Sequence, residues 1–154
     1  MRLVGVILIL GLVLGVTALG LAENVKRVAS IMEFQGTVEV KMGKAAWQSA
    51  QKGMTLNPGD MIRTKKNSFA LLNVDGKAET ATVEVKENSQ VKLSELLENK
   101  KDGTQSTLLD LALGNILIKA KKLHSEKSKF EVKTPTSIVA VRGTTFSVAV
   151  EAIE

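Results

Sequence analysis

The stretch Lys129-Phe130-Glu131-Val132-Lys133-Thr134-Pro135 alternates charged and apolar side chains and then ends at a proline. Alternation of this kind places the apolar residues on one face of an extended strand and the charged residues on the other. The period of two recurs in residues 36–41, 80–86, 90–93 and 145–150, while residues 115–120 are more uniformly apolar. Short turn signals such as Asp-Gly separate these segments. The pattern predicts a single compact all-β domain, either an antiparallel β-sandwich or a small β-roll.

A few segments fit this pattern less clearly. Leu93–Asn99 and Thr107–Leu113 could each form a short helical turn, although strand patterns flank both of them. The polar segment Glu98–Ser106 has the composition of a loop, and we expect it to lie within the domain.

The composition excludes several kinds of site. The chain has 154 residues and a formal charge of +5, with 21 Lys and Arg, 16 Asp and Glu, a single His and no Cys. Without Cys there are no disulfides or thiolate ligands, and His124 alone cannot build a histidine zinc site or a catalytic triad. Nothing in the sequence concentrates the paired carboxylates of acid–base catalysis. Aromatic residues make up 3%, which disfavours base stacking. We therefore expect no enzyme, no cofactor, no metal and no nucleic-acid partner.

The N-terminus predicts export. Arg2 precedes an uncharged run, Leu3–Ala22, that ends in the small residues expected before a signal-peptidase site. We expect residues 1–22 to be a signal peptide and residues 23–154 to be the folded domain. An uncleaved anchor is the alternative, because about 20 apolar residues can cross a bilayer as a helix. After cleavage the domain is expected to be periplasmic or extracellular. Without cleavage it is expected to be periplasmic and anchored to the membrane by residues 3–22.

Several segments together resemble the FecR domain family. Gly36–Val40 and the single Trp47 resemble the start of that domain. Gly53–Thr64 is similar to the pattern G-x-x-L-x-x-G-D-x-I-x-T, and Ser68–Gly76 resembles a strand that runs into an Asp-Gly turn. The longest match is Phe130–Val148, which is similar to F-x-V-x-T-P-x-x-x-x-x-V-R-G-T-x-F-x-V.

The resemblance extends over residues 28–150 and implies a periplasmic signalling module. Founding members of that family read the occupancy of an outer-membrane transporter and pass the signal through a membrane helix to a sigma factor. Because only Met1-Arg2 precedes the apolar run here, we expect no sigma-binding segment, and we also expect no small domain of the kind that follows in transporter-linked regulators. The expectation is a free-standing exported FecR module, and a role in iron regulation does not carry over.

Most residues of the matched motifs have a structural explanation. Gly59 and Gly76 suit turns that need positive φ, and Asp60 and Asp75 can accept hydrogen bonds from nearby amides. Arg142 is expected to pair with a carboxylate or with strand-end carbonyls, and contact with an anionic ligand is the alternative. The full set of motif residues expected to be structural is Gly36, Gly59, Asp60, Asp75, Gly76, Thr134, Pro135, Arg142, Gly143, Thr144 and Phe146.

Lysines near the C-terminus suggest a candidate binding surface. If residues 115–121 and 127–133 paired as a hairpin, their lysines would share its outward face. Such lysines can prevent edge-to-edge aggregation, or they can bind an anionic polymer, lipid headgroups or an acidic protein. Trp47 would either pack as a lid on the end of the domain or serve as an exposed contact. The candidate partner-binding residues are Lys119, Lys121, Lys127, Lys129, Lys133 and Trp47.

The function that follows is recognition or scaffolding at the cell envelope, by protein binding and as part of a signal relay. The alternative is a binder of cell-wall polysaccharide or of another anionic envelope ligand. The last strand, Thr145–Val150, would leave one edge uncovered. Three explanations stay open: Val25–Ile31 covers the edge, the chain is a truncated form of a longer protein, or a partner adds a strand, including a second copy of this chain.

Overall fold

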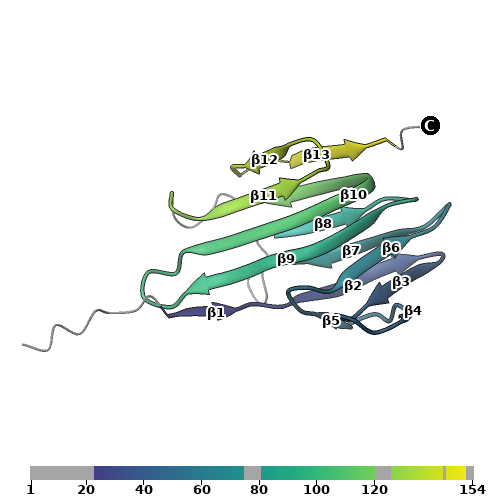
Figure 1. Ribbon diagram of the computed structural model, residues 1–154, viewed down its shortest axis with the longest axis horizontal. Helices are drawn as coiled ribbons and strands as arrows, with labels where there is room; N and C mark the ends of the chain where they lie inside the picture. Colours follow the sequence, from purple (N-terminus) through teal and green to yellow (C-terminus); the bar gives the residue numbers. More distant parts are fainter. Residues whose placement is uncertain (1–22, 75–80, 121–125, 144, 152–154) are drawn as a thin grey trace, which may run out of the picture.

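The computed structural model describes residues 23–74, 81–120, 126–143 and 145–151, and within them it contains strands and no helix. This confirms the all-β prediction, and the two segments that might have been helical turns lie in strands β9 and β10 (Figure 1). The polar segment is shorter than expected, because β9 ends at Asn99 and β10 begins at Gln105. The strands are β1 (Asn24–Lys26), β2 (Ala29–Gln35), β3 (Val38–Lys41), β4 (Trp47–Ser49), β5 (Thr55–Leu56), β6 (Met61–Thr64), β7 (Phe69–Asn73), β8 (Ala81–Val85), β9 (Gln90–Asn99), β10 (Gln105–Ala120), β11 (Lys129–Lys133), β12 (Ile138–Val141) and β13 (Thr145–Val150).

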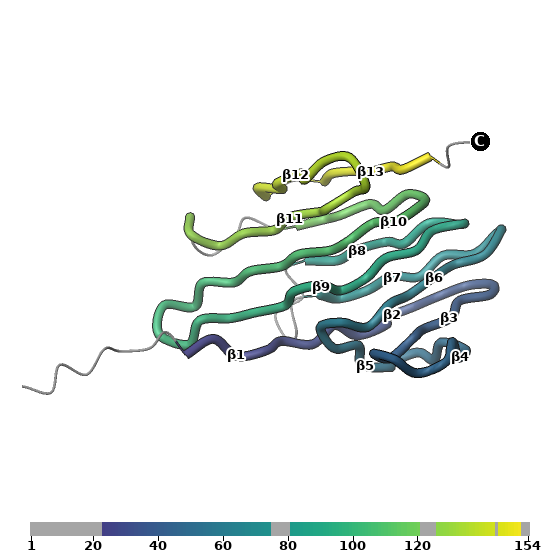
Figure 2. Tube along the Cα trace, in the orientation of Figure 1, coloured from purple at the N-terminus to yellow at the C-terminus, as the bar shows by residue number. Residues whose placement is uncertain are grey.

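The strands form one sheet that curls into a half-barrel, so the sandwich form is not confirmed. Neighbouring strands follow the order β4-β3-β6-β9-β10-β8-β7-β2-β5, with β1 on β9, β11 on β10, β12 on β11 and β13 on β10. We call β1, β3, β4, β6, β9, β11 and β12 with residues 105–113 of β10 the β9 half. The β8 half is β2, β5, β7, β8 and β13 with residues 114–120. Figure 2 shows β10 running along both halves.

Apolar residues of both halves meet in one core. In β6 and β9, Ile62 and Leu93 are fully buried, and so are Leu72 of β7 and Val83 of β8. These residues alternate along their strands with more exposed neighbours, as the period of two requires. The curled sheet therefore buries its inner face and leaves its outer face to solvent.

Strand β10 is 16 residues long and belongs to both halves. Residues 105–113 pair antiparallel with β9, and residues 116–120 pair antiparallel with β8. Gly114 stands between these two pairings with φ of +94°, and a Cβ placed there would lie 2.1 Å from Ser89 Oγ. Only glycine combines this backbone conformation with so close an approach. Gly114 thus lets one strand pass from the first half to the second.

A buried arginine forms hydrogen bonds at the end of the sheet where β1 pairs with β9. Arg27 is 8% exposed, and its guanidinium donates to the carbonyl oxygens of Val74 at 2.7 Å, Leu97 at 3.1 Å and Ser106 at 3.1 Å. It also donates to the Thr107 hydroxyl at 2.7 Å. Because buried carbonyls need hydrogen-bond partners, this one side chain stabilises the ends of strands from both halves.

The predicted hairpin between residues 115–121 and 127–133 does not form. Strand β11 instead runs parallel to β10, with Lys129 opposite Ser106 and Lys133 opposite Asp110. Strand β13 pairs antiparallel with residues 114–119 of β10. Alternation fixes which face a residue occupies, but it does not choose the neighbouring strand. The alternation in these segments also predicts Ile118, Ala120, Phe130 and Val132 on the inward face. Ile118, Phe130 and Val132 are buried in the core, and Ala120 is partly buried and packs against it.

The N-terminal strand does not cover the last strand either. Residues 24–26 pair with β9, and Ala29 and Ser30 of β2 pair with β5. Strand β13 pairs with β10, and no other strand of the described chain pairs with its outer edge. The explanation that Val25–Ile31 covers this edge was therefore wrong.

Candidate functional site

Trp47 lies on the outer face of the β9 half, where it stacks on an arginine. The Arg63 Cζ atom is 4.1 Å from the centroid of the Trp47 ring. Lys41 of β3 stands opposite both Trp47 of β4 and Met61 of β6, so the outward residues of the three strands form adjacent rows. The intervening Val40 points inward and is fully buried. Burial of the inner face thus fixes which side chains surround the tryptophan.

A carboxylate holds the arginine in place against the ring. Arg63 Nε donates a hydrogen bond to Glu39 Oε2 at 2.7 Å, and Lys65 Nζ lies 3.7 Å from the same oxygen. The bond from Arg63 keeps the pKa of Glu39 below its usual value of 4.5. We call Trp47, Arg63, Glu39 and Lys65 the Trp47 cluster. Its arginine is fixed on one side by the ring and on the other by the carboxylate, before any partner binds.

The row that begins at Trp47 continues across the β9 half as far as β12. Successive residues of this row stand opposite one another on adjacent strands. Three of them are lysines and one is an aspartate. The row is Trp47, Lys41, Met61, Lys92, Asp110, Lys133 and Ile138. Its last member, Ile138, is 63% exposed. The outer face of this half therefore combines apolar ends with a mainly basic centre.

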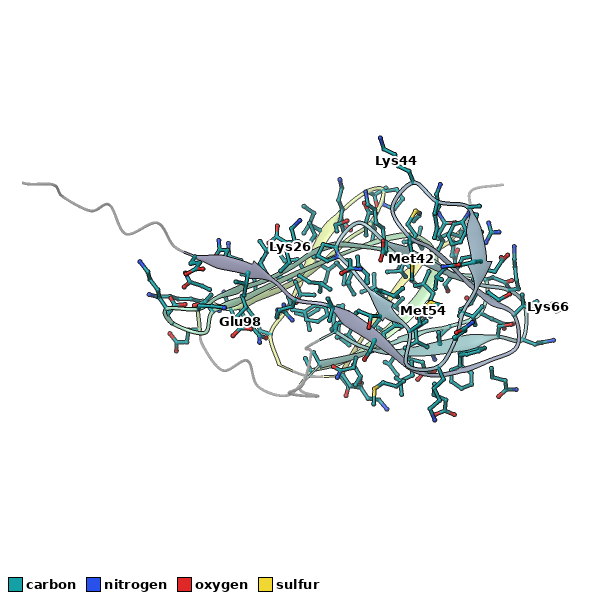
Figure 3. The ribbon with its side chains drawn as sticks, turned by 90° about the horizontal axis from the view of Figure 1, so that it is seen from below. Lys26, Met42, Lys44, Met54, Lys66 and Glu98 are labelled. Atoms are coloured by element: carbon teal, nitrogen blue, oxygen red, sulfur yellow. The ribbon has the colours of Figure 1, made fainter. Side chains whose placement is uncertain are left out.

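The loops at this end of the sheet divide into covered and exposed parts. Met54, beside β5, packs against the core, whereas Lys44 in the turn between β3 and β4 points away from the molecule (Figure 3). The Trp47 side chain itself is half-buried. It is therefore not fully covered, as a lid on the end of the domain would be, and its role as a contact residue stays a prediction.

The lysines expected to share one hairpin face are divided between different parts of the molecule. Lys119 lies in the β8 half, opposite Thr82 and Thr145. Lys129 and Lys133 lie on β11 in the β9 half. Lys127 precedes β11, and Lys121 lies outside the described residues. The four lysines that the structure describes form no single patch, and the hairpin on which the predicted anion-binding face depended does not form.

Two of these lysines line a groove that also contains acidic residues. Lys127 and Lys129 border a groove of about 290 Å³ together with Glu95 and Asp102. The Thr104 amide donates to Asp102 at 2.9 Å, and this bond lowers the pKa of the Asp102 carboxyl. Because the groove carries charges of both signs, it has no clear preference for an anion.

The motif residues before position 75 occupy tight turns. Gly36 and Gly59 have φ of +75° and +99°, and a Cβ on Gly36 would lie 2.3 Å from Ser68 Oγ. Asp60 is 5% exposed and accepts hydrogen bonds from the amides of Gly43 at 2.8 Å and Asn57 at 2.7 Å. This is the capping arrangement that turn chemistry leads us to expect. The motif residues Asp75, Gly76 and Thr144 lie outside the described part of the chain.

Most of the later motif residues lie in the turns that join β11 to β12 and β12 to β13. Buried Thr134 accepts a hydrogen bond from the Ser137 amide at 3.1 Å, which closes the turn that contains exposed Pro135. Gly143 has φ of +62°. Arg142 is exposed, and no hydrogen bond or ion pair joins it to another described residue, so the expected pairing with a carboxylate or carbonyl is not observed there.

The residues around Trp47 that matter most were not found from the sequence. Arg63 and Glu39 lie on different strands, and only the register of β3 and β6 brings them together. The signal that existed was alternation in both segments, which places the two residues outward but not side by side. Arg27 was also missed, since nothing around it in sequence shows that its guanidinium is buried.

Within the described residues, no group of three or more His, Cys, Asp or Glu side chains is placed to hold a metal ion. Over the same part of the chain, no helix is long and apolar enough to span a membrane.

Together the fold and the site define an all-β module with a preorganised aromatic and cationic surface. A protein-family model described as FecR protein matches residues 60–153. The chain therefore belongs to the FecR family, whose members are signalling and regulatory proteins associated with the cell envelope. This confirms the resemblance seen in the sequence. Neither a curated protein nor a solved structure matches the chain.

Proposed function

We propose that this chain is a non-enzymatic FecR module that binds a protein of the cell envelope through the Trp47 cluster and takes part in a cell-surface signal relay. The observation that carries the proposal is the stack of Arg63 on Trp47 on a solvent-facing sheet surface. Trp and Arg are the residue types that most often dominate the energy of protein interfaces.

The cluster is suited to binding because its arginine is already ordered. The hydrogen bond to Glu39 and the contact with the Trp47 ring fix the Arg63 side chain. A partner that binds there does not have to order a free arginine, which otherwise costs about 0.5–1.5 kcal/mol. Both Arg63 and Glu39 keep about a quarter of their side-chain surface accessible, so a partner can reach them.

The charges around the cluster favour an acidic partner surface. Lys41, Lys65 and Lys92 lie on or beside the outward rows of this face, and Glu39 is already engaged by Arg63. A partner with carboxylates opposite these lysines would gain electrostatic complementarity, which mainly raises the association rate and the specificity. Its affinity should therefore decrease with salt.

A pull-down from envelope extract tests the proposal. We expect Trp47→Ala and Arg63→Gln each to reduce recovery of the partner about tenfold, and Trp47→Phe to retain part of the binding because an aromatic ring remains. Lys100→Gln in the exposed β9–β10 turn is the matched control for loss of charge, and it should bind as the unmodified protein does.

The same proteins sedimented with purified cell wall test the alternative ligand class. Full recovery of the partner by Trp47→Ala would overturn the role of the cluster. Sedimentation with cell wall, without capture of a protein, would instead support an anionic polymer as ligand, and Lys129 and Lys133 would then be the residues to replace.

A further inference from the structure

Strand β13 is apolar, and no strand of the described chain lies beside its outer edge. Strands β11 and β13 lie along the same edge of β10, β11 beside residues 106–110 and β13 beside residues 114–119 (Figure 1). Strand β12 covers the far edge of β11. In the described chain, no strand occupies the corresponding position beside β13. Its outward-pointing amides and carbonyls can therefore pair with another strand.

The sequence of β13 lacks the usual protection of an edge strand. Thr145–Val150 contains no charged residue and no proline, which are the features that commonly prevent edge-to-edge pairing. Phe146 stands opposite Ile118 and so faces the core side of the sheet, yet Phe146 is 36% exposed while Ile118 is fully buried. The core is thus incompletely covered at this edge.

An apolar groove runs along the same strand. It has a volume of about 700 Å³ and lies between β13 and the turn formed by residues 134–137, with Ala112 and Leu113 of β10 also lining it. Leu113 is 40% exposed. An added strand beside β13 would bring its own core-facing side chains to the open side of this groove.

We propose that the occupant is a second copy of this chain, whose β13 pairs antiparallel with β13 about a two-fold axis at Val148. A two-fold pairing places each residue opposite its symmetry counterpart about the centre. Centred on Val148, it sets Phe146 opposite Val150 of the second copy and the two Val148 residues opposite each other. All of these side chains face the core side, where Phe146 is exposed.

The charges near the strand fit a second copy of the same sequence. In this register Thr145 stands between Lys119 of its own sheet and Glu151 of the second copy, all on the outer face. Adjacent strands are about 4.8 Å apart, so the two charged residues are about 10 Å apart at the backbone, within reach of their long side chains. Both Lys119 and Glu151 are exposed, and the symmetry forms this pair twice.

The expected dimer is weak. A contact through one six-residue strand and the mouth of a groove buries less than the about 1,600 Å² of a standard interface. Association should therefore depend on protein concentration. It involves β13, whereas the proposed partner site involves β4, β3 and β6, so either proposal can fail without the other.

Charge exchange at the interface provides the test. We expect sedimentation velocity of the full exported chain to show a concentration-dependent dimer. Lys119→Glu and Glu151→Lys should each raise its dissociation constant about tenfold, because like charges then meet, and the double exchange should restore it. Lys100→Glu has the same charge change as Lys119→Glu but lies far from β13, and it should leave the dimer unchanged, as should Trp47→Ala.

Hydrogen exchange distinguishes this dimer from other coverings of the edge. Amides of residues 146–150 that face away from β10 should become protected as concentration rises. A monomer at all concentrations, a dimer insensitive to the single exchanges, or a double exchange that fails to rescue would overturn the proposal. Equal protection at every concentration would also overturn it, since the chain itself would then cover the edge.

Discussion

Burial alternates along both halves of β10, but the strands beyond its outer edge differ between them. In the β9 half, β10 is followed by β11 and then β12, and Val132 of β11 is fully buried. In the β8 half β10 is followed by β13, the last described strand on that side, and Phe146 there is 36% exposed. The comparison teaches that alternation determines which residues face the core, whereas the next strand outward determines how well they are covered.

The largest expected loss of stability comes from a substitution at Gly114, where β10 passes from one half to the other. Gly114→Ala forces a Cβ toward Ser89 and keeps a residue with a side chain at φ of +94°. Left-handed backbone costs about 1–2 kcal/mol and overpacking about 1–3 kcal/mol, so we expect a loss of about 4 kcal/mol in urea unfolding. Gly103→Ala, at a turn with open space around it, should lose about 1 kcal/mol. Equal losses in the two variants would show that Ser89 moves aside without a cost in free energy.

The next effect concerns the far end of the β9 half. Arg27→Met retains a long side chain but leaves the carbonyls of Val74, Leu97 and Ser106 without the guanidinium. Buried acceptors without partners cost about 1–3 kcal/mol each, and water can reach part of this site, so we expect a loss of about 3 kcal/mol. Hydrogen exchange should show faster opening of β1 and of the end of β9. A loss confined to β13 would contradict this assignment.

A matched pair of valines compares the closed and open sides directly. Val132 and Val148 occupy equivalent inward positions on β11 and β13, with 0% and 7% exposure. We expect Val132→Ala to cost about 2 kcal/mol and Val148→Ala about 1 kcal/mol in dilute protein, because the second cavity lies beside an open groove and can relax. The same cost at both positions would mean that the β13 side is as well packed as the β11 side.

The smallest effect is on the outer face and depends on pH. Arg63 lowers the pKa of Glu39, so the ionised carboxylate stabilises the folded state above pH 4.5, and this contribution disappears as pH falls through the lowered pKa. The melting temperature of Glu39→Gln should therefore be below that of the unmodified protein at neutral pH, and the difference should shrink below pH 4.5. A constant difference across this range would exclude the ion pair as its cause.

Much of the strand content could be predicted because alternation is local. Segments such as residues 129–133 and 145–150 are strands in the structure, and Phe130 and Val132 face the core as the pattern requires. The pairing could not be predicted in the same way. A hairpin between neighbouring segments is the simplest connection, yet β11 lies parallel to the distant beginning of β10.

The candidate site was less accessible to sequence reasoning than the fold. Trp47 was singled out because it is the only tryptophan, but its contact with Arg63 depends on the positions of β3, β4 and β6 in the sheet. The lysines near the C-terminus looked like one group in sequence, and non-local pairing separated Lys119 from Lys129 and Lys133. Residues that meet through register leave no signal at any fixed spacing.

The position of β10 also determines when the chain can fold. Strands β6 and β7 are complete early in synthesis, but the sheet path from the β9 half to the β8 half passes through β10. The partners on its other edge, β11 and β13, follow β10 in the chain, and pairings between distant segments form slowly. A nascent chain that ends before β10 therefore has two unjoined sets of strands with exposed apolar faces, and we expect it to acquire stable structure only after synthesis is nearly finished.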